Sequence, residues 1–251
     1  MPLINEIGLL PFEVASGARQ MAIDQWMLEQ PGAWLRFYGW LRPTLSLGRN
    51  QGPDPQMNLS AARAAGIDLV RRATGGQAVL HHLELTYSFA AGVPPMARSI
   101  LQSYRDIRQP LLTGLSTLGL SLSAAPEEAK FRPVSSVCFA KAAGHEILYQ
   151  GRKLVGSAQR RSRGRLLQHG SILLGLDLDL HQRVWPQRAA QDWARETANL
   201  GEILGEVEPE GLAKRLEISF ALAFGAQLRP HQWSAEERQG LKATEGRFSV
   251  L

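Results

Sequence analysis

Apolar positions recur at helical spacing in some segments and alternate with polar ones in others. Helical spacing predicts long helices over residues 16–30, 100–118 and 210–224. Ser16 is placed to cap the first of these helices, and Pro31-Gly32 ends it. Shorter helices are expected over residues 58–65 and 189–198.

Short apolar or alternating runs between turn residues predict the strands. They cover residues 34–38, 44–47, 67–70, 146–150, 153–157 and 166–174. Residues 78–82 and 85–90 are expected to pair as a hairpin, and residues 160–165 to form a basic turn. Strands interleaved with helices and joined by short turns indicate an α+β fold with mixed, largely antiparallel sheets.

Composition narrows the class of protein. The chain has 251 residues, 44% of them hydrophobic, with no repeat and no clear linker, so we expect one domain over residues 1–251. Its formal net charge is +5, and the 28 basic residues are mostly arginine. No metal-ligand cysteine pairs, aromatic RNA-binding run or lysine-rich tail is present. We therefore expect an acidic protein partner and no nucleic acid.

The single cysteine, Cys138, excludes an intrachain disulfide and favours the cytoplasm. The first residues lack the basic region of a signal peptide. No apolar run approaches the length of a membrane span. The histidines outside the motifs described next show no metal-ligand spacing, so no metal is expected.

Four short motifs carry the candidate chemistry. They are RRATGGQAVLH from Arg71, ELTYS from Glu84, GRKLVGSAQ from Gly151 and LQHGSIL from Leu167. The glycine pair in the first motif lets backbone approach a ligand closely, and an arginine offers a fixed fork of donors. From the residues alone, Arg72 is either a ligand-facing donor or a surface residue. His81 and His169 are either structural or chemical.

These four motifs at this spacing resemble the lipoate–protein ligase, octanoyltransferase and biotin ligase superfamily. The resemblance covers roughly residues 18–224. It implies the catalytic-domain fold of biotin and lipoate ligases, a curved mixed sheet flanked by helices. It also implies a set of substrate-binding residues: Arg72, Gly75, Gly76, His81, Gly156, Ser157, Ala158 and His169.

Cys138 identifies the branch of the superfamily. A lone cysteine between Val137 and Phe139 is by itself typical of a small buried hydrophobe. A Cys-Phe pair upstream of the Lys153 motif, however, resembles the LipM-type octanoyltransferases, whose cysteine carries an acyl thioester. The resemblance thus implies that Cys138 and Lys153 are catalytic. The ammonium of Lys153 would lower the pKa of the thiol, which favours the nucleophilic thiolate.

The implied reaction moves octanoate from acyl carrier protein, through Cys138, to a lysine of a lipoyl-domain protein such as the glycine-cleavage H protein. Exchange between thioesters needs no ATP, so no cofactor is expected. One alternative is an ATP-dependent lipoate–protein ligase whose accessory domain is a separate chain. Others are an octanoyl amidotransferase acting between lipoyl domains and a non-catalytic acyl-binding protein. Only 77 residues follow Leu174, and Gln77 stands where ligases of the superfamily often have a third glycine. Both features disfavour the ligase.

An octanoyl chain also needs an apolar slot, worth about 0.8 kcal/mol for each buried methylene. Ala78, Leu80, Val155 and Leu167 either line such a slot or fill the core.

Overall fold

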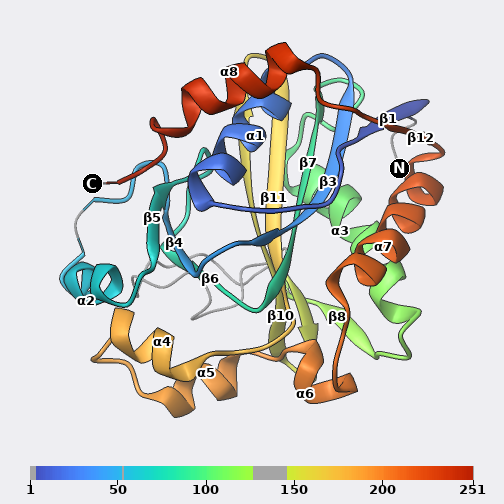
Figure 1. Ribbon diagram of the computed structural model, residues 1–251. Helices are drawn as coiled ribbons and strands as arrows, with labels where there is room; N and C mark the ends of the chain where they lie inside the picture. Colours follow the sequence, from blue (N-terminus) through green and yellow to red (C-terminus); the bar gives the residue numbers. More distant parts are fainter. Residues whose placement is uncertain (1–3, 53, 127–145, 251) are drawn as a thin grey trace.

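A computed structural model describes residues 4–52, 54–126 and 146–250. These residues form two sheets and eight helices. The sheets and helices pack in layers (Figure 1). The predicted α+β fold with mixed, largely antiparallel sheets is confirmed.

The larger sheet holds nine of the described strands in the order β12-β1-β3-β7-β11-β10-β9-β8, with β2 beside β3. Their bounds are β1 (Glu6–Leu9), β2 (Glu13–Ala15), β3 (Ala33–Trp40), β7 (Glu84–Gly92), β8 (Leu122–Ala124), β9 (Ile147–Tyr149), β10 (Arg152–Ser162), β11 (Arg165–Leu173) and β12 (Gln227–Pro230). Pairing is parallel at the β12-β1-β3 edge and antiparallel from β3 to β8. The three later motifs therefore lie side by side on β7, β11 and β10.

The smaller sheet has the order β5 (Asp68–Arg71), β4 (Thr44–Leu47) and β6 (Val79–His81). The expected hairpin of residues 78–82 with 85–90 is wrong, because β6 pairs with β4 while β7 pairs with β3 and β11. Leu83, between them, has a positive φ of 51°, where the chain passes from one sheet to the other. The first motif is thus carried to the site by a different sheet from the second.

The described helices are α1 (Gly17–Glu29), α2 (Leu59–Ala64), α3 (Ile100–Ser116), α4 (Leu178–Val184), α5 (Ala190–Glu196), α6 (Leu200–Leu204), α7 (Pro209–Phe224) and α8 (Ala235–Glu245). Helices α3 and α7 pack on one face of the larger sheet, and α1, backed by α8, lies on the other (Figure 1). Helices α2, α4 and α5 share a core with the smaller sheet. None of the described helices is both long and apolar enough to span a bilayer.

The four apolar residues considered for an acyl slot belong to these cores. Val155 packs under α3 and α7, Leu167 under α1, and Ala78 and Leu80 in the core of the smaller sheet. Each is at most 5% exposed. They fill the core, as alternating residues in buried strands usually do.

The predicted basic turn over residues 160–165 is also corrected. Strand β10 continues through Arg160 and Arg161 to Ser162, which pairs with Arg165 on β11. Only Arg163 and Gly164 form the turn, with φ of 50° and 73°, as a two-residue hairpin loop requires. Arg160 and Arg161 therefore point to opposite faces of the sheet.

Candidate functional site

The site is built on the face of the larger sheet that helix α1 covers. Successive strand residues point to opposite faces, so alternate positions of one strand share a face. On β7 the buried apolar residues Leu85, Tyr87 and Phe89 belong to the core under α3 and α7. The alternate residues Glu84, Thr86 and Ser88 therefore face α1, and all three are buried.

Helix α1 brings polar groups to meet this face. Ser16 caps the helix by accepting a hydrogen bond from the Arg19 amide, as predicted. Gln20 and Asp24, one turn apart, are both completely buried. A helix that buries polar residues against a sheet presents them to partners rather than to water.

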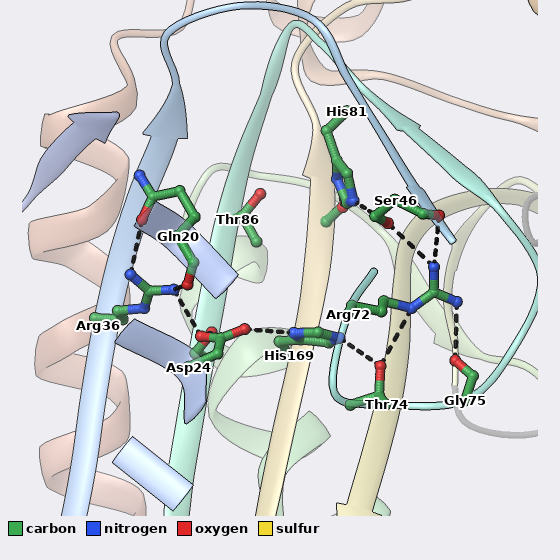
Figure 2. A network of polar contacts seen from close by, with 12 residues as sticks. Gln20, Asp24, Arg36, Ser46, Arg72, Thr74, Gly75, His81, Thr86 and His169 are labelled. Atoms are coloured by element: carbon green, nitrogen blue, oxygen red, sulfur yellow. Dashed lines mark hydrogen bonds and ion pairs between the residues drawn. The ribbon is translucent and has the colours of Figure 1, made fainter. Parts of the chain in front are cut away.

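Asp24 anchors the first branch of a buried polar network. Its carboxylate accepts from Arg36 at 2.6 Å, from Ser88 at 2.6 Å and from His169 Nδ1 at 2.7 Å. His169 Nε2 lies 2.7 Å from the hydroxyl of Thr74. Figure 2 shows this branch running from β3 across α1 and β11 to the loop of the first motif.

Glu84 anchors a second branch with the same order of groups. Its Oε1 lies 2.8 Å from His81 Nδ1, and His81 Nε2 lies 2.8 Å from the hydroxyl of Ser46. Oε1 also accepts from Ser171 at 2.7 Å and from the indole of Trp40 at 3.0 Å. The Trp40 ring stacks on His81 with centroids 4.1 Å apart.

Arg72 joins the two branches (Figure 2). Its guanidinium donates to the hydroxyl of Thr74 at 3.2 Å and to that of Ser46 at 3.1 Å. It also donates to the carbonyls of Gly75 and Gln77 at 2.8 and 2.7 Å. Arg72 therefore fixes the glycine loop against the smaller sheet.

The hydrogen bonds of Thr74 define the tautomer of His169. Because Thr74 Oγ1 accepts from Arg72, its own proton is free to point at His169 Nε2. The ring proton then lies on Nδ1, facing Asp24. Burial lowers the pKa of His169, and the charge of Arg72 adds to this effect, while Asp24 only partly offsets it. The imidazole of His169 is therefore neutral in the folded protein.

Both carboxylates of the network stay ionised. Burial alone would raise the pKa of Asp24, but Arg36, His169 and Ser88 outweigh burial and bring it to about 2. Burial likewise opposes ionisation of Glu84, and His81 and the neighbouring hydroxyls outweigh it, so its pKa lies below the usual value. The negative charges of Asp24 and Glu84 are thus balanced by the positive charges of Arg36 and Arg72, all of them buried.

A cavity opens beside this layer and holds about 410 Å³ of empty space, its mouth included. All four motifs contribute to its wall. It is lined by Met21, Tyr38, Trp40, Arg72, Val79, His81, Thr86, Gly156, Ser157, Ala158, His169, Gly170 and Ser171.

The structure therefore brings six of the predicted substrate-binding residues together. They are Arg72, His81, Gly156, Ser157, Ala158 and His169. Ser157 is also fixed from behind, since its hydroxyl lies 2.8 Å from that of Tyr87. Burial raises the pKa of Tyr87 to about 12, so that phenol is a neutral partner.

Gly75 and Gly76 lie outside this cavity. Both are exposed, and they line a separate depression with residues 50–52, 54 and 55. A side chain on Gly48 would meet the Gly76 carbonyl at 1.9 Å, so the loop after β4 packs directly on the pair. The close approach thus requires a glycine at Gly48, whereas Gly75 has open space around it, Gly76 has a positive φ of 92°, and Arg72 donates to the Gly75 carbonyl.

Lys153 lies on β10, three residues before the cavity-lining Gly156. It is 2% exposed and forms an ion pair with the buried carboxylate of Glu146. A buried ammonium requires such a partner. Cys138, the other predicted catalytic residue, lies outside the described residues.

Several residues of the network and of the cavity wall lie outside the four motifs: Gln20, Asp24, Arg36, Tyr38, Trp40 and Ser46. The one available signal is a polar residue within a buried pattern, such as Asp24 in the apolar stripe of α1. Within the described residues, no three His, Cys, Asp or Glu side chains are grouped to hold a metal ion.

Comparison with known proteins places this site in context. Residues 16–221 match the family model described as lipoyl protein ligase A/B catalytic domain. Octanoyltransferase LipM of Kyrpidia tusciae is 40% identical over 245 residues, with 89% of each chain covered. Octanoyltransferase LipM of Bacillus subtilis is 34% identical, covering 89% of this chain and 88% of that protein.

Two solved structures share the fold. One is lipoate-protein ligase A bound with ATP, with a TM-score of 0.81, 22% identity and coverage of 96% of this chain and 95% of that one. The other is protein Ta0514 from T. acidophilum with bound lipoic acid, with a TM-score of 0.79, 20% identity and coverage of 97% and 96%. At these identities the likeness extends to the fold alone.

Proposed function

Because this chain belongs to the lipoyl protein ligase A/B catalytic domain family, we propose that it is an octanoyltransferase of lipoate biosynthesis, acting at the cavity described above. The superfamily predicted from the four motifs is confirmed, and so is an acyltransferase that moves octanoyl groups. The proposal treats residues 1–251 as a single catalytic domain.

One observation supports the proposal that the reaction takes place in this cavity. All four motifs, distant in sequence and drawn from two sheets, supply wall residues to a single cavity. Apolar side chains of Met21, Tyr38, Trp40 and Val79 form part of that wall. They offer the acyl chain a surface away from water, at about 0.8 kcal/mol per methylene.

In the proposed first step, the thiolate of Cys138 attacks the carbonyl carbon of the octanoyl thioester. A new carbon–sulfur bond forms, the bond to the donor sulfur breaks, and the donor leaves as a thiol after taking a proton. The ammonium of Lys153, held by Glu146, is proposed to stabilise the thiolate and then the carbonyl oxygen. Backbone amides near Gly156 and Ser157 are candidate partners of the same oxygen.

In the proposed second step, a lysine amine of the acceptor attacks the thioester on Cys138. A carbon–nitrogen bond forms, the carbon–sulfur bond breaks, and the amine proton leaves as the cysteine regains its thiolate. Arg72, His81 and His169 are proposed to shape the substrate side of the cavity. Their own hydrogen bonds to Ser46 and Thr74 support a positioning role rather than proton transfer.

The family implies in general an acyl donor and a lipoyl-domain acceptor. We propose octanoyl-acyl carrier protein as the donor and a lipoyl-domain protein such as the glycine-cleavage H protein as the acceptor. The net charge of +5 suits acidic partners. The proposal also includes the cytoplasmic location predicted from the single cysteine.

The test is a transfer assay with octanoyl-acyl carrier protein and a lipoyl domain, without ATP. We expect mass spectrometry to find octanoate in amide linkage on the acceptor lysine, and Cys138→Ser and Lys153→Met to abolish it. Transfer that requires ATP and free acid, and that survives Cys138→Ala, would establish a ligase instead.

A further inference from the structure

A second cleft continues the catalytic cavity along the same two elements. It is lined by Gln25, Leu28, Glu29, Arg160, Arg163 and Arg165, among others, and holds about 750 Å³ of empty space, its mouth included. Met21 of α1 lines the cavity, and Gln25 and Leu28 follow it at helical spacing. The cavity and the cleft thus follow one another along α1 and β10.

Strand β10 places the two openings in the same order. Gly156, Ala158 and Arg160 occupy alternate positions, opposite Ser171, His169 and Leu167 of β11. They therefore share one face, with the first two lining the cavity and Arg160 lining the cleft. At about 3.3 Å per residue, Arg160 lies about 7 Å beyond Ala158.

The cleft has an excess of positive charge, with three guanidinium groups against the single carboxylate of Glu29. Arg165 is already engaged, since it donates to the carbonyls of Leu28 and Gly32 at the end of α1 at 2.9 and 3.0 Å. It thereby offsets the negative end of the helix dipole.

Arg160 differs from Arg165. Its Nε is buried and has no hydrogen-bond partner in the described structure, and no ion pair is found for it among the described residues. Burial lowers the pKa of Arg160, and the nearby charge of Arg49 lowers it further, against a smaller opposing effect of Glu29. A half-buried cation without a partner beside a second cation is a position that an anion would stabilise.

We propose that Arg160 binds the phosphate of a phosphopantetheine-type acyl donor, with Arg49 as a second cation and the acyl thioester lying toward Gly156. This inference rests on the proposed function, because it assigns a subsite for the donor of that reaction.

The length of the phosphopantetheine arm matches the distance between Arg160 and Gly156 along β10. Its sulfur and phosphorus are about a dozen bonds apart, which spans about 15 Å if each bond advances as in an extended polypeptide. On β10 this is a distance of about four to five residues, which leads from Arg160 back to Gly156. The phosphate subsite and the catalytic cavity are thus separated by one arm length.

The experiment compares two donors that differ only in the phosphate, S-octanoyl-pantetheine 4′-phosphate and S-octanoyl-pantetheine, in the full-length protein. Wild type should prefer the phosphorylated donor in kcat/KM, and Arg160→Gln should reduce that preference about tenfold or more. Arg160→Lys, which keeps the charge, should retain part of it. The control Arg63→Gln, an exposed arginine on α2, should leave the preference unchanged.

Other results overturn the inference. An unchanged preference for the phosphorylated donor in Arg160→Gln contradicts it. So does an Arg160→Gln variant that loses only ATP-dependent ligation of free octanoate, because Arg160 would then bind the phosphate of a nucleotide. If wild type transfers from neither donor and not from octanoyl-acyl carrier protein either, the proposed function fails. Calorimetry with pantetheine 4′-phosphate then decides, with about tenfold weaker binding to Arg160→Gln supporting the subsite and equal binding refuting it.

Discussion

The two branches that meet at Arg72 have the same order of groups, carboxylate, imidazole and hydroxyl, but their charges are balanced differently. Asp24 binds a guanidinium directly, through Arg36 at 2.6 Å. Glu84 has no arginine or lysine within ion-pair distance among the described residues and relies on His81, two hydroxyls and an indole. Both branches thus supply a histidine to the cavity wall, and the ion pair of Asp24 with Arg36 additionally holds α1 to the sheet.

The largest expected effect follows from removing the charge of Asp24. Asp24→Asn leaves Arg36 buried without its counter-charge, which should lower the free energy of unfolding by about 3–5 kcal/mol. Urea denaturation measures this. Asp192→Asn is the matched control, because its partner Arg195 is largely exposed, and it should cost less than about 1 kcal/mol. Equal costs for the two variants would contradict the role given to Asp24.

A smaller loss is expected for Glu84→Gln. The change weakens several hydrogen bonds to a charged group but leaves no guanidinium without its partner, so about 1–3 kcal/mol is expected in the same urea experiment. The loss of unfolding free energy should be smaller than that of Asp24→Asn. A cost as large as that of Asp24→Asn would show that the two branches are equivalent.

Acid should destabilise the protein in two stages. The pKa of His169 is lowered from 6.5, so the unfolded chain binds its proton first and stability falls as pH drops below 6.5. The pKa of Asp24 is lowered from 3.8 to about 2, so its contribution is present above pH 3.8 and is lost toward pH 2, a difference of about 2 kcal/mol.

Thermal unfolding of wild type and His169→Gln across this range checks the assignment. The variant should lose the part of the upper stage that comes from His169 and keep the part from His181, whose pKa burial also lowers, as well as the lower stage. An upper stage of unchanged size in His169→Gln would contradict the assignment.

The smallest effect is expected for Trp40→Phe. A phenyl ring keeps the stacking on His81 but cannot donate to Glu84 or Thr86, so a loss of about 1 kcal/mol is expected. Because Trp40 and Glu84 share a hydrogen bond, the double variant with Glu84→Gln should cost less than the sum of the single variants. Strict additivity would mean that the indole acts independently of this branch.

The sequence predicts the local elements well and their partners less well. Periodicity located α1, α3 and α7 and most strands, because burial of one face imposes a period on the chain. It placed residues 78–82 beside 85–90, since adjacency in sequence is the usual sign of a hairpin, whereas a turn at Leu83 sends the two strands to different sheets. Helix α8 was not predicted, because its buried contact is a single residue, Leu241.

The motifs predicted six of the cavity residues but not the network that holds them. Ser46 and Thr74 become important only through hydrogen bonds to histidines 35 and 95 residues away. No periodicity records such contacts. The residues alone leave Arg72 as either a ligand-facing donor or a surface residue. In the structure it is buried, and it donates to the glycine loop and to Ser46 and Thr74.

The central claim is that octanoate passes through a thioester on Cys138, and intact-mass analysis tests it most directly. Wild type is mixed with octanoyl-acyl carrier protein without ATP and without acceptor, and then digested to locate the adduct. We expect one octanoyl group per chain, on the peptide that contains Cys138, removable by hydroxylamine and absent from Cys138→Ala. Acceptor octanoylation that proceeds with no such adduct, or an adduct of equal yield in Cys138→Ala, would contradict it.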